Sequence, residues 1–583
     1  MFSLLCCSKQ PLSSCSYPSD HSPHNTGLEI EILDELSKKF TVIAQKDPVL
    51  LLVGGFQGSG KSSLINRIKK IFATNIISTD AIRQSLLNRG VKVSPEFSAS
   101  VNRIYWALVK KSLSTHSHTI IDANAHAKRL QEIEELLAKE QFKHRKITIF
   151  LNTSEKTLRN RLQTRQPLPD CYEGTEKDLD ASLASSKLNL EDYDLVIDTD
   201  QMNEWNVYEL VSHFLSYHLK INHVHLKDSI LHLITNKDDN FISYLKEAIR
   251  KITQAVHHRV KTDPSFQTTW KSTHLEIEHE AITMLDTEIL EPKRRSFRKE
   301  VDRSPEHLPY AHNQFLLKDG RPVSASYINL SVIDPACPTM IAAQAPMPTT
   351  ISLFWSMVAE SRSNLIVMLT DLVEEIDLQR HKVKCTRYWP ERVRETLFLE
   401  GHGKITLIHR EQIFSTKDKE LWHSKLHITV EGVERTIDHF WLRGWKDGKG
   451  LNSLELQHLL LERIHQHVNA YPDCPPIIHC SAGVGRTGTV IGSYLAKHLL
   501  AWSPSAKEKS MSSKKALPLE ITLYLRYQRS HLIHTLDQYL GLNRFIQSIE
   551  PKKEKAAKQH SLALPVAIIV FAVATIAILK SKK

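Results

Sequence analysis

The sequence predicts an α/β protein with an N-terminal parallel-sheet domain, a C-terminal α+β domain and one C-terminal transmembrane helix. Three observations carry this prediction. Apolar β-branched runs alternate with helical spacing in the first third of the chain, strands and helices mix again towards the C-terminus, and an uncharged apolar run lies near its end. At 583 residues the chain is too long for one domain of about 150 residues.

Hydrophobic periodicity gives the N-terminal elements. Strands are expected at 49–53, 76–78, 119–121, 146–151 and 195–197, and helices at 61–72, 101–113 and 131–140. Strands that alternate with helices build a parallel sheet between helical layers. We therefore expect a disordered segment at 1–27, a nucleotide-binding domain at 28–220, a helical connector at 221–269, an α+β domain at 270–550, a basic linker at 551–561 and an anchor at 562–579.

Composition narrows the partners and excludes some classes. The net charge of +11 favours anionic partners, such as phosphorylated substrates, nucleotides, anionic lipid or nucleic acid. The eight cysteines are irregularly spaced and form no CxxC pair, so neither a zinc site nor a disulfide framework is indicated.

The run from Leu562 to Leu579 is uncharged and has lysines on both sides. At about 1.5 Å per residue it would reach about 27 Å, enough for a thin bilayer. The sequence thus predicts a single-pass C-terminal membrane anchor with the catalytic domains on the cytosolic side. It does not name the membrane.

Residues Gly55 to Ser62 match the GxxxxGK[ST] pattern and lie between a predicted strand and a predicted helix. Glycines let backbone N–H groups curl around phosphates, and the helix N-terminus adds the positive end of its dipole. We expect this P-loop to bind ATP, with Lys61 at the outer phosphates and Ser62 as a ligand of Mg²⁺. The expected nucleotide-binding residues of the loop are Gly55, Gly58, Ser59, Gly60, Lys61 and Ser62.

Charged residues beyond the P-loop indicate what is done with the nucleotide. Asp80 follows the second strand, where a carboxylate can accept a proton from an acceptor hydroxyl. Asp122 ends the next strand, where a carboxylate would orient the metal ion. Arg161 and Arg165 share a helix face and could close over the phosphates, and the alternative is a solvated helix face.

This constellation resembles the small P-loop kinases of the polynucleotide-kinase and zeta-toxin type over about residues 45–215. The resemblance implies a P-loop NTPase domain in which Asp80 is the base and Arg83 holds the acceptor. The acceptor stays open between a polynucleotide 5′-hydroxyl, a sugar and another small alcohol. A regulatory NTPase that transfers phosphate to no hydroxyl compound is the rival interpretation.

A second phosphate loop is predicted at His479–Gly488, between a buried strand at 476–478 and a helix at 489–500. Its amides and Arg486 would bind a phosphoryl dianion, and the same positive field would lower the pKa of Cys480, so that it attacks as a thiolate. Thr487 would steady the sulfur as it leaves. The loop residues are Ser481, Ala482, Gly483, Val484, Gly485 and Arg486.

Residues from about 270 to 550 resemble the catalytic domain of protein tyrosine phosphatases. The matching motifs are Tyr327–Asn329, Gln344–Pro346, Ile366–Thr370, Lys384–Pro390 and Trp445–Asp447. The resemblance implies an α+β tyrosine-phosphatase domain that needs no cofactor and uses Asp447, in the place of the family's mobile Trp-Pro-Asp loop, as general acid.

The chain also departs from that pattern. Lys446 replaces the proline of the mobile loop, which puts the rigidity and closing rate of the loop in doubt. Gln538 matches the second of two catalytic glutamines, whereas His534 replaces the first, which orients the hydrolytic water. The aromatic wall of the substrate loop is either Phe297 or missing. These departures concern turnover and phosphotyrosine specificity, whereas the residues of the thiolate chemistry match the family.

The leading hypothesis is a membrane-anchored tyrosine phosphatase fused to an ATP-dependent kinase. The alternatives are a phosphoinositide phosphatase with a nucleotide-sensing domain and a pseudophosphatase adaptor that binds phosphorylated partners. Nucleic acid is not favoured as a partner, because the sequence offers no aromatic and basic strand face and the anchor argues against it.

Overall fold

The computed structural model divides the chain into two compact units, Met1–Ser212 and His213–Lys583. It describes residues 27–69, 74–122, 127–164, 175–185, 188–219, 239–263, 265–290, 294–375, 381–399, 403–503 and 511–549. Residues 1–26 of the segment expected to be disordered at 1–27 lie outside the described residues, as do the expected segments at 551–561 and 562–579, while Gly27 begins a helix. In the described part of the chain, no helix is both long enough and apolar enough to span a membrane.

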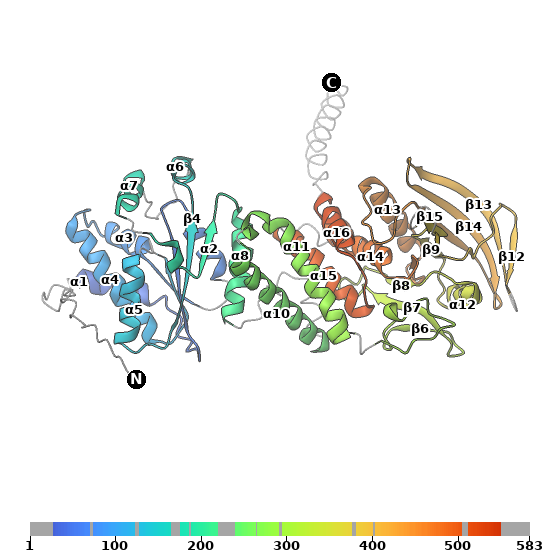
Figure 1. Cartoon of the computed structure of the whole chain (residues 1–583), viewed down its shortest axis with the longest axis horizontal. Helices are drawn as coiled ribbons and strands as arrows, with labels where there is room; N and C mark the ends of the chain where they lie inside the picture. The colour runs from blue at the N-terminus through green and yellow to red at the C-terminus, as the bar shows by residue number, and fades with distance from the viewer. Residues whose placement is uncertain are drawn as a thin grey trace, which may run out of the picture. The chain divides into compact units, whose positions relative to one another are not determined.

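The first unit is built on a five-stranded sheet (Figure 1) in the order β2-β3-β1-β4-β5, in which all neighbouring strands run parallel. The strands are β1 (Val49–Gly55), β2 (Asn75–Ser78), β3 (Thr119–Asp122), β4 (Arg145–Asn152) and β5 (Leu195–Asp198). The central strand β1 is buried along its whole length, as its continuous apolar run requires. The predicted parallel sheet is confirmed.

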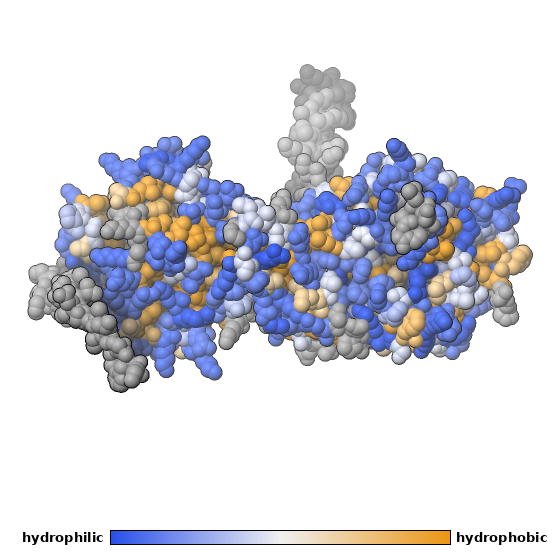
Figure 2. Space-filling model, in the orientation of Figure 1, coloured by the Kyte–Doolittle hydropathy of each residue, from blue (hydrophilic) through white to orange (hydrophobic). Residues whose placement is uncertain are grey.

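Helices connect these strands and cover the sheet. They are α1 (Gly27–Ser37), α2 (Lys61–Ile68), α3 (Thr79–Leu87), α4 (Pro95–Ser114), α5 (Ala127–Lys139), α6 (Glu155–Thr164), α7 (Glu176–Ser185) and α8 (Glu204–Leu219), whose residues from His213 on belong to the second unit. One core joins apolar side chains of α1 and α3–α7 to β1, β3 and β4. Figure 2 shows hydrophilic residues over much of the described surface on the visible face.

The second unit contains a nine-stranded sheet in the order β12-β13-β14-β15-β9-β16-β8-β7-β6, and its four middle strands β15, β9, β16 and β8 run parallel. The strands are β6 (Gln314–Leu316), β7 (Pro322–Asn329), β8 (Thr339–Ala343), β9 (Leu365–Met368), β12 (Thr396–Leu399), β13 (Gly403–Ser415), β14 (Glu420–Val430), β15 (Val433–Arg443) and β16 (Ile477–His479). A separate hairpin pairs β10 (Val373–Glu375) with β11 (His381–Val383).

Helices lie against this sheet. They are α10 (Asp239–Thr262), α11 (Phe266–Leu285), α12 (Ile351–Glu360), α13 (Leu454–Ala470), α14 (Gly485–Lys497), α15 (Met511–Gln528) and α16 (Leu536–Ser548). Helices α10 and α11 share a buried cluster with the sheet and with α13–α16. The second unit thus combines a mixed sheet with helices, as the α+β prediction requires.

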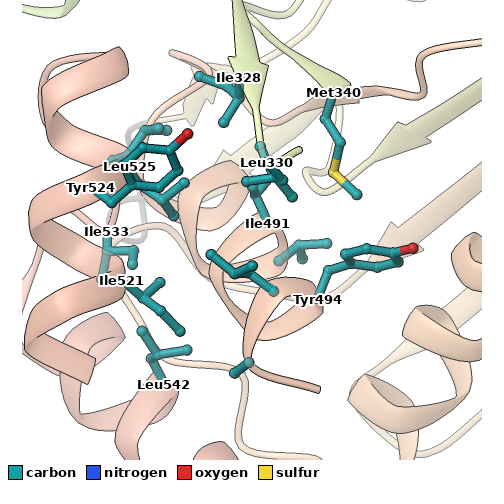
Figure 3. Close-up of a cluster of buried hydrophobic side chains, with 14 of the residues drawn as sticks. Ile328, Leu330, Met340, Ile491, Tyr494, Ile521, Tyr524, Leu525, Ile533 and Leu542 are labelled. Carbon is teal, nitrogen blue, oxygen red and sulfur yellow. The ribbon is translucent and has the colours of Figure 1, made fainter. Parts of the chain in front are cut away.

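Alternation along the middle strands places side chains in two separate cores. In β9, Leu365 and Val367 join one core while Ile366 and Met368 join the other. This follows from the period of two residues in a strand. Figure 3 shows Ile491 of α14 in the core that also contains Leu365 and Val367, together with Ile521 of α15 and Ile328 of β7. The helix behind the predicted Cys480 loop is therefore anchored by deep apolar packing.

Candidate functional site

The P-loop of the first unit connects β1 to α2. Three of its glycines have positive φ: Gly55 at 146°, Gly58 at 83° and Gly60 at 99°. A Cβ on Gly55 would lie 2.5 Å from the Ser59 hydroxyl, and one on Gly58 would lie 3.2 Å from the Leu158 carbonyl. Only glycine fits such positions without strain, so the backbone can curl as a phosphate cradle requires.

The P-loop lysine lies inside its own cradle. Lys61 Nζ donates to the carbonyl oxygens of Gly55 (2.8 Å) and Phe56 (3.1 Å). Burial lowers the pKa of Lys61, while the charges of Asp122 and Asp80 oppose that shift. These carbonyls are weak partners for a buried ammonium, which leaves Lys61 available for a phosphate anion.

Two carboxylates lie close to Lys61. Burial raises the pKa of Asp122, and its Oδ2 accepts a hydrogen bond of 3.4 Å from Ser62 Oγ. Asp80 pairs with Arg83 at 2.6 Å on the first turn of α3. The carboxyl ends of parallel strands β1 and β3 share one edge of the sheet, which is why these distant residues meet.

A hydroxyl and a carboxylate together form the donor set that Mg²⁺ takes beside nucleotide phosphates. Ser62 and Asp122 provide that pair, so the residues present fit the ion, whose chemistry there would be to neutralise phosphate charge. Within the described ranges no group of three or more His, Cys, Asp or Glu side chains is arranged to hold a metal ion. Mg²⁺ would therefore depend on the nucleotide for its other ligands.

One of the two candidate lid arginines reaches the P-loop. Arg161 Nη1 donates to the Gly58 carbonyl at 3.3 Å, and its Nη2 donates to the Thr199 carbonyl at 3.3 Å. Arg159, two residues earlier on α6, pairs instead with Glu155 and Asp180. Arg165 lies outside the described residues.

The second phosphate loop runs from β16 to α14 in the second unit. Its carbonyl oxygens are held from outside: Arg529 donates to Gly483 O at 3.0 Å and Ala482 O at 3.4 Å, and the Ala345 amide donates to Ser481 O at 3.0 Å. Because the N–H of a peptide group points away from its carbonyl, a loop whose carbonyls face outwards directs its N–H groups towards the space that it encloses. Gly483 has φ 73°, and a Cβ there would lie 2.2 Å from the Ala343 carbonyl, so only glycine lets the loop pass this strand.

Cys480 lies at the start of this loop as a buried free thiol. Burial by itself would raise the pKa of the thiol. The positive charge of Arg486 and hydrogen bonding by Thr487 outweigh burial and hold the pKa below its ordinary value. A lowered pKa increases the fraction of thiolate, which is the reactive form of a cysteine.

Arg486 connects Cys480 to the loop that carries Asp447. Arg486 Nη1 donates to Glu374 Oε1 at 2.7 Å and to the Trp445 carbonyl at 2.6 Å, and its Nη2 lies 3.2 Å from Asp447 Oδ1. Lys384 pairs with the other oxygen of Asp447. The loop after β15 is therefore folded over the arginine, and the predicted nucleophile, phosphate ligand and acid come together.

The carboxyl of Asp447 is 51% exposed, so a substrate can reach it. Burial of its other side would raise the pKa, but the charges of Arg486 and Lys384 outweigh it and hold the pKa of Asp447 below its usual range. A phosphoryl dianion that took over Arg486 would remove one of these contacts and add negative charge, both of which raise the pKa of the acid.

Behind the nucleophile, a buried hydrogen-bond chain positions the end of β16. His479 Nδ1 contacts the Cys480 carbonyl at 3.1 Å, and its Nε2 contacts the Tyr388 hydroxyl at 2.7 Å. Tyr388 also contacts His439 Nε2 at 2.9 Å. Burial lowers the pKa of His479 to about 4, so the chain is neutral at physiological pH.

The residues expected to handle water lie next to the loop. Gln538 Oε1 accepts from the amides of His534 (3.0 Å) and Thr535 (3.2 Å), and its amide group packs on Gly485, where a Cβ would come within 2.7 Å. His534 is largely buried, and burial, with the charges of His531 and Arg526, lowers its pKa to about 4. A neutral imidazole thus stands where the family has an amide.

The segment that follows Phe297 reaches the site through Val301 and Arg303. The Gln344 side chain accepts from the Arg303 amide at 2.8 Å and donates to the Val301 carbonyl at 3.2 Å, and Arg303 reaches the Ala345 carbonyl at 3.4 Å. Phe297, the candidate aromatic wall, is 44% exposed. The segment beside Cys480 is therefore polar and basic.

The fold and the site define a cysteine-dependent phosphatase domain joined to a P-loop domain. A family model for protein-tyrosine phosphatase matches residues 298–548, and a model described as an AAA domain matches residues 50–188. The chain is 32% identical to Tyrosine-protein phosphatase 3 of Schizosaccharomyces pombe over 224 residues. This matched region covers 37% of this chain and 70% of that protein. The chain belongs to the protein-tyrosine phosphatase family.

Two further relatives are longer than the matched region. Tyrosine-protein phosphatase 1 of Dictyostelium discoideum is 34% identical over 194 residues, which cover 31% of this chain and 36% of that protein. Tyrosine-protein phosphatase non-receptor type 5 of Mus musculus is 33% identical over 239 residues, which cover 40% of each chain. The similarity thus covers the phosphatase domain and leaves the rest of these proteins unmatched.

Sequence reasoning assigned no role to three charged residues of the site: Glu374, Lys384 and Arg529. Glu374 holds Arg486 at 2.7 Å, Lys384 pairs with Asp447, and Arg529 holds the loop carbonyls. Lys384 was recognised as part of a family motif without a role. For Glu374 and Arg529 no local pattern was available, because their partners lie 112 and 46 residues away.

Proposed function

We propose that the second unit hydrolyses phosphotyrosine in proteins through a cysteinyl-phosphate intermediate. The observation that carries this proposal is the buried Cys480 thiol, whose pKa is lowered beside Arg486 under the Asp447 loop. Loop amides and Arg486 would hold the phosphoryl group for in-line attack.

In the first step the Cys480 thiolate forms a bond to phosphorus as the phosphorus–oxygen bond to the tyrosyl group breaks. Asp447, protonated in the complex, gives its proton to the departing phenolate oxygen. In the second step water attacks the phosphorus of the cysteinyl-phosphate and gives a proton back to Asp447, while the sulfur–phosphorus bond breaks, so that inorganic phosphate leaves and the Cys480 thiolate is restored. Gln538 and His534 border the space for that water.

The test uses the full chain and a phosphotyrosine peptide. Wild type should release phosphate, and Cys480→Ser should release none while it still binds the peptide. Equal release by both proteins would exclude thiolate catalysis. A parallel arm with phosphoinositide vesicles separates the alternative substrate class, and peptide binding without turnover by wild type would instead support the adaptor hypothesis.

For the first unit we propose binding of ATP and Mg²⁺ and transfer of the terminal phosphate to a hydroxyl acceptor. Lys61, Ser62 and Arg161 surround the cradle, and Asp80 stands at the same sheet edge as candidate base. Labelled ATP offered with alcohols, sugars and oligonucleotides tests this. Nucleotide hydrolysis without any labelled product would favour the regulatory NTPase.

We further propose that residues 562–579 anchor the chain in a membrane with both catalytic units on the cytosolic side. The apolar run between lysine clusters supports this. Carbonate extraction of cell membranes should leave the full chain in the pellet and a chain that ends at residue 561 in the supernatant. A full chain found in the supernatant would contradict the proposal.

A further inference from the structure

A cavity of about 660 Å³ opens beside the Cys480 site, at the ends of β13, β14 and β15. Three arginines line it, and each guanidinium lies over an indole ring. The distances from guanidinium carbon to ring centre are 5.3 Å for Arg387 over Trp389, 4.6 Å for Arg410 over Trp422, and 4.9 Å for Arg443 over Trp441. We call these three residues and their cavity the arginine pocket.

The arginines of this pocket are incompletely paired. Arg387 Nη1, Arg410 Nε and Arg443 Nε are buried and make no hydrogen bond to the described residues. Arg410 has no carboxylate oxygen within 4 Å in the described part of the chain, and its Nη1 reaches only the Glu391 carbonyl at 3.4 Å. Buried donors without acceptors are costly, and an anion would supply the acceptors.

The like charges of the pocket repel each other. Burial lowers the pKa of Arg410, and the nearby charges of Arg387 and Arg443 lower it further, while Glu391 and Glu420 oppose the shift. Four carboxylates also line the cavity. Glu391, 68% exposed, lies 3.6 Å from Arg387, and Glu420 and Asp371 lie 2.8 and 3.6 Å from Arg443, whereas Asp418 pairs with Lys419. Among the described residues none of them lies within 4 Å of Arg410, which is the arginine left for an added anion. Stacking on indole rings explains how the guanidinium planes are oriented, but not why three cations converge on one cavity.

One pocket residue, Arg443, lies in the same segment of the chain as the loop that carries Asp447. Arg443 ends β15, and the Gly444 amide donates to Asp371 Oδ2 at 3.0 Å. Asp447 lies four residues after Arg443, so their Cα atoms are at most about 14 Å apart. A peptide that extends from Cys480 past the Asp447 loop towards Arg443 would cover that span of about 14 Å in roughly four residues.

We propose that the arginine pocket binds a second phosphoryl group carried on the same substrate chain as the phosphotyrosine that enters the Cys480 site. A phosphoryl dianion offers three acceptor oxygens, and arginine forks bind such groups bidentately. The proposal rests on the proposed function of the Cys480 site, since it names a feature of that site's substrate.

The kinetic test compares four peptides on the full chain: phosphotyrosine alone, and phosphotyrosine with phosphoserine, glutamate or serine four residues away. The phosphoserine peptide should have a KM about tenfold lower than the singly phosphorylated one, which corresponds to about 1.4 kcal/mol. Arg387→Gln and Arg410→Gln should each remove most of that advantage and leave the KM of the singly phosphorylated peptide unchanged. Equal KM values for the first two peptides would overturn the proposal.

Two controls test whether the effect is specific to the arginine pocket and whether the two phosphoryl groups must be on one peptide. Lys425→Gln removes an exposed charge from the same hairpin and should keep the full advantage. A mixture of the singly phosphorylated peptide with a separate phosphoserine peptide should not lower KM. If the mixture works as well as the linked peptide, the pocket takes a free anion and the assignment to the substrate chain is wrong. An advantage that survives in both arginine variants would also refute it.

Binding is measured independently of turnover. Cys480→Ser should bind the doubly phosphorylated peptide about tenfold more tightly than the singly phosphorylated one, by fluorescence anisotropy. If wild type shows no turnover but this difference in affinity persists and is lost in Arg387→Gln, the proposed catalytic function fails while the pocket stands. Because Arg410 packs between indoles, a melting curve of each variant checks the fold, and Arg387→Gln provides the test should Arg410→Gln unfold.

Discussion

Glu278 on α11 lies in a buried position against the phosphatase core, and replacing it with glutamine is our most quantitative prediction. The side chain is 5% exposed, its Oε2 accepts a hydrogen bond of 2.6 Å from the Tyr539 hydroxyl, and its Oε1 lies 3.6 Å from His274. Burial raises the pKa of Glu278 to about 7, against an ordinary value of 4.5. Glutamine keeps the size and the acceptor but cannot ionise.

Proton linkage gives the sign and the size of the change in the free energy of unfolding that Glu278→Gln should cause. Because the folded pKa is raised, the folded state favours the protonated carboxyl. Its contribution to stability is fully present below pH 4.5, falls as the pH rises from about 4.5 to about 7, and is lost above. A difference of about 2.5 pKa units corresponds to about 3 kcal/mol. Relative to wild type, Glu278→Gln should therefore gain about 3 kcal/mol of stability between pH 4.5 and pH 8.

Urea unfolding followed by tryptophan fluorescence provides the assay, since seven of the nine tryptophans lie in the second unit, after residue 212. The quantity of interest is the free energy of unfolding of Glu278→Gln minus that of wild type, measured at pH 4.5 and at pH 8. Glu280→Gln, an exposed change on the same helix, should give a difference that barely moves with pH. If the Glu278→Gln difference is equally flat, the carboxyl is not held protonated and the reasoning is refuted.

Three further predictions concern the two sites. Asp447→Asn should lower kcat about 100-fold for aryl phosphates with poor leaving groups and little for those with good ones, because only the former need an acid; an equal loss for both in a leaving-group series would remove Asp447 from that role. His534→Gln should raise the steady-state rate about tenfold and shrink the pre-steady-state burst in stopped-flow assays, since an amide would orient the water; an unchanged burst would show that hydrolysis of the intermediate is not limited there. Lys61→Ala should weaken binding of a fluorescent ATP analogue about 10- to 100-fold while phosphatase kcat stays constant, and unchanged affinity would contradict a phosphate contact.

Local sequence was enough to locate both phosphate loops, because their function resides in the backbone. Glycines at set spacing, a preceding apolar strand and a following helix are visible in one window of residues, and the structure has them at β1–α2 and β16–α14. The parallel order of the first sheet was also predictable, since strand–helix alternation constrains the connections. His534 and Lys446 were visible as departures for the same reason.

The tertiary structure decided which side chains complete each site. Glu374, Lys384 and Arg529 reach the Cys480 loop from distant segments. No local pattern marks Glu374 or Arg529, and the motif that contains Lys384 does not indicate its pairing with Asp447, because these partners meet only in the folded chain. The arginine pocket is of the same kind, because its cations come from three segments that meet only where β13, β14 and β15 end. Sequence alone thus determined the chemistry of each loop, since backbone curvature is local. Folding determined the electrostatic surroundings, since charge acts through space.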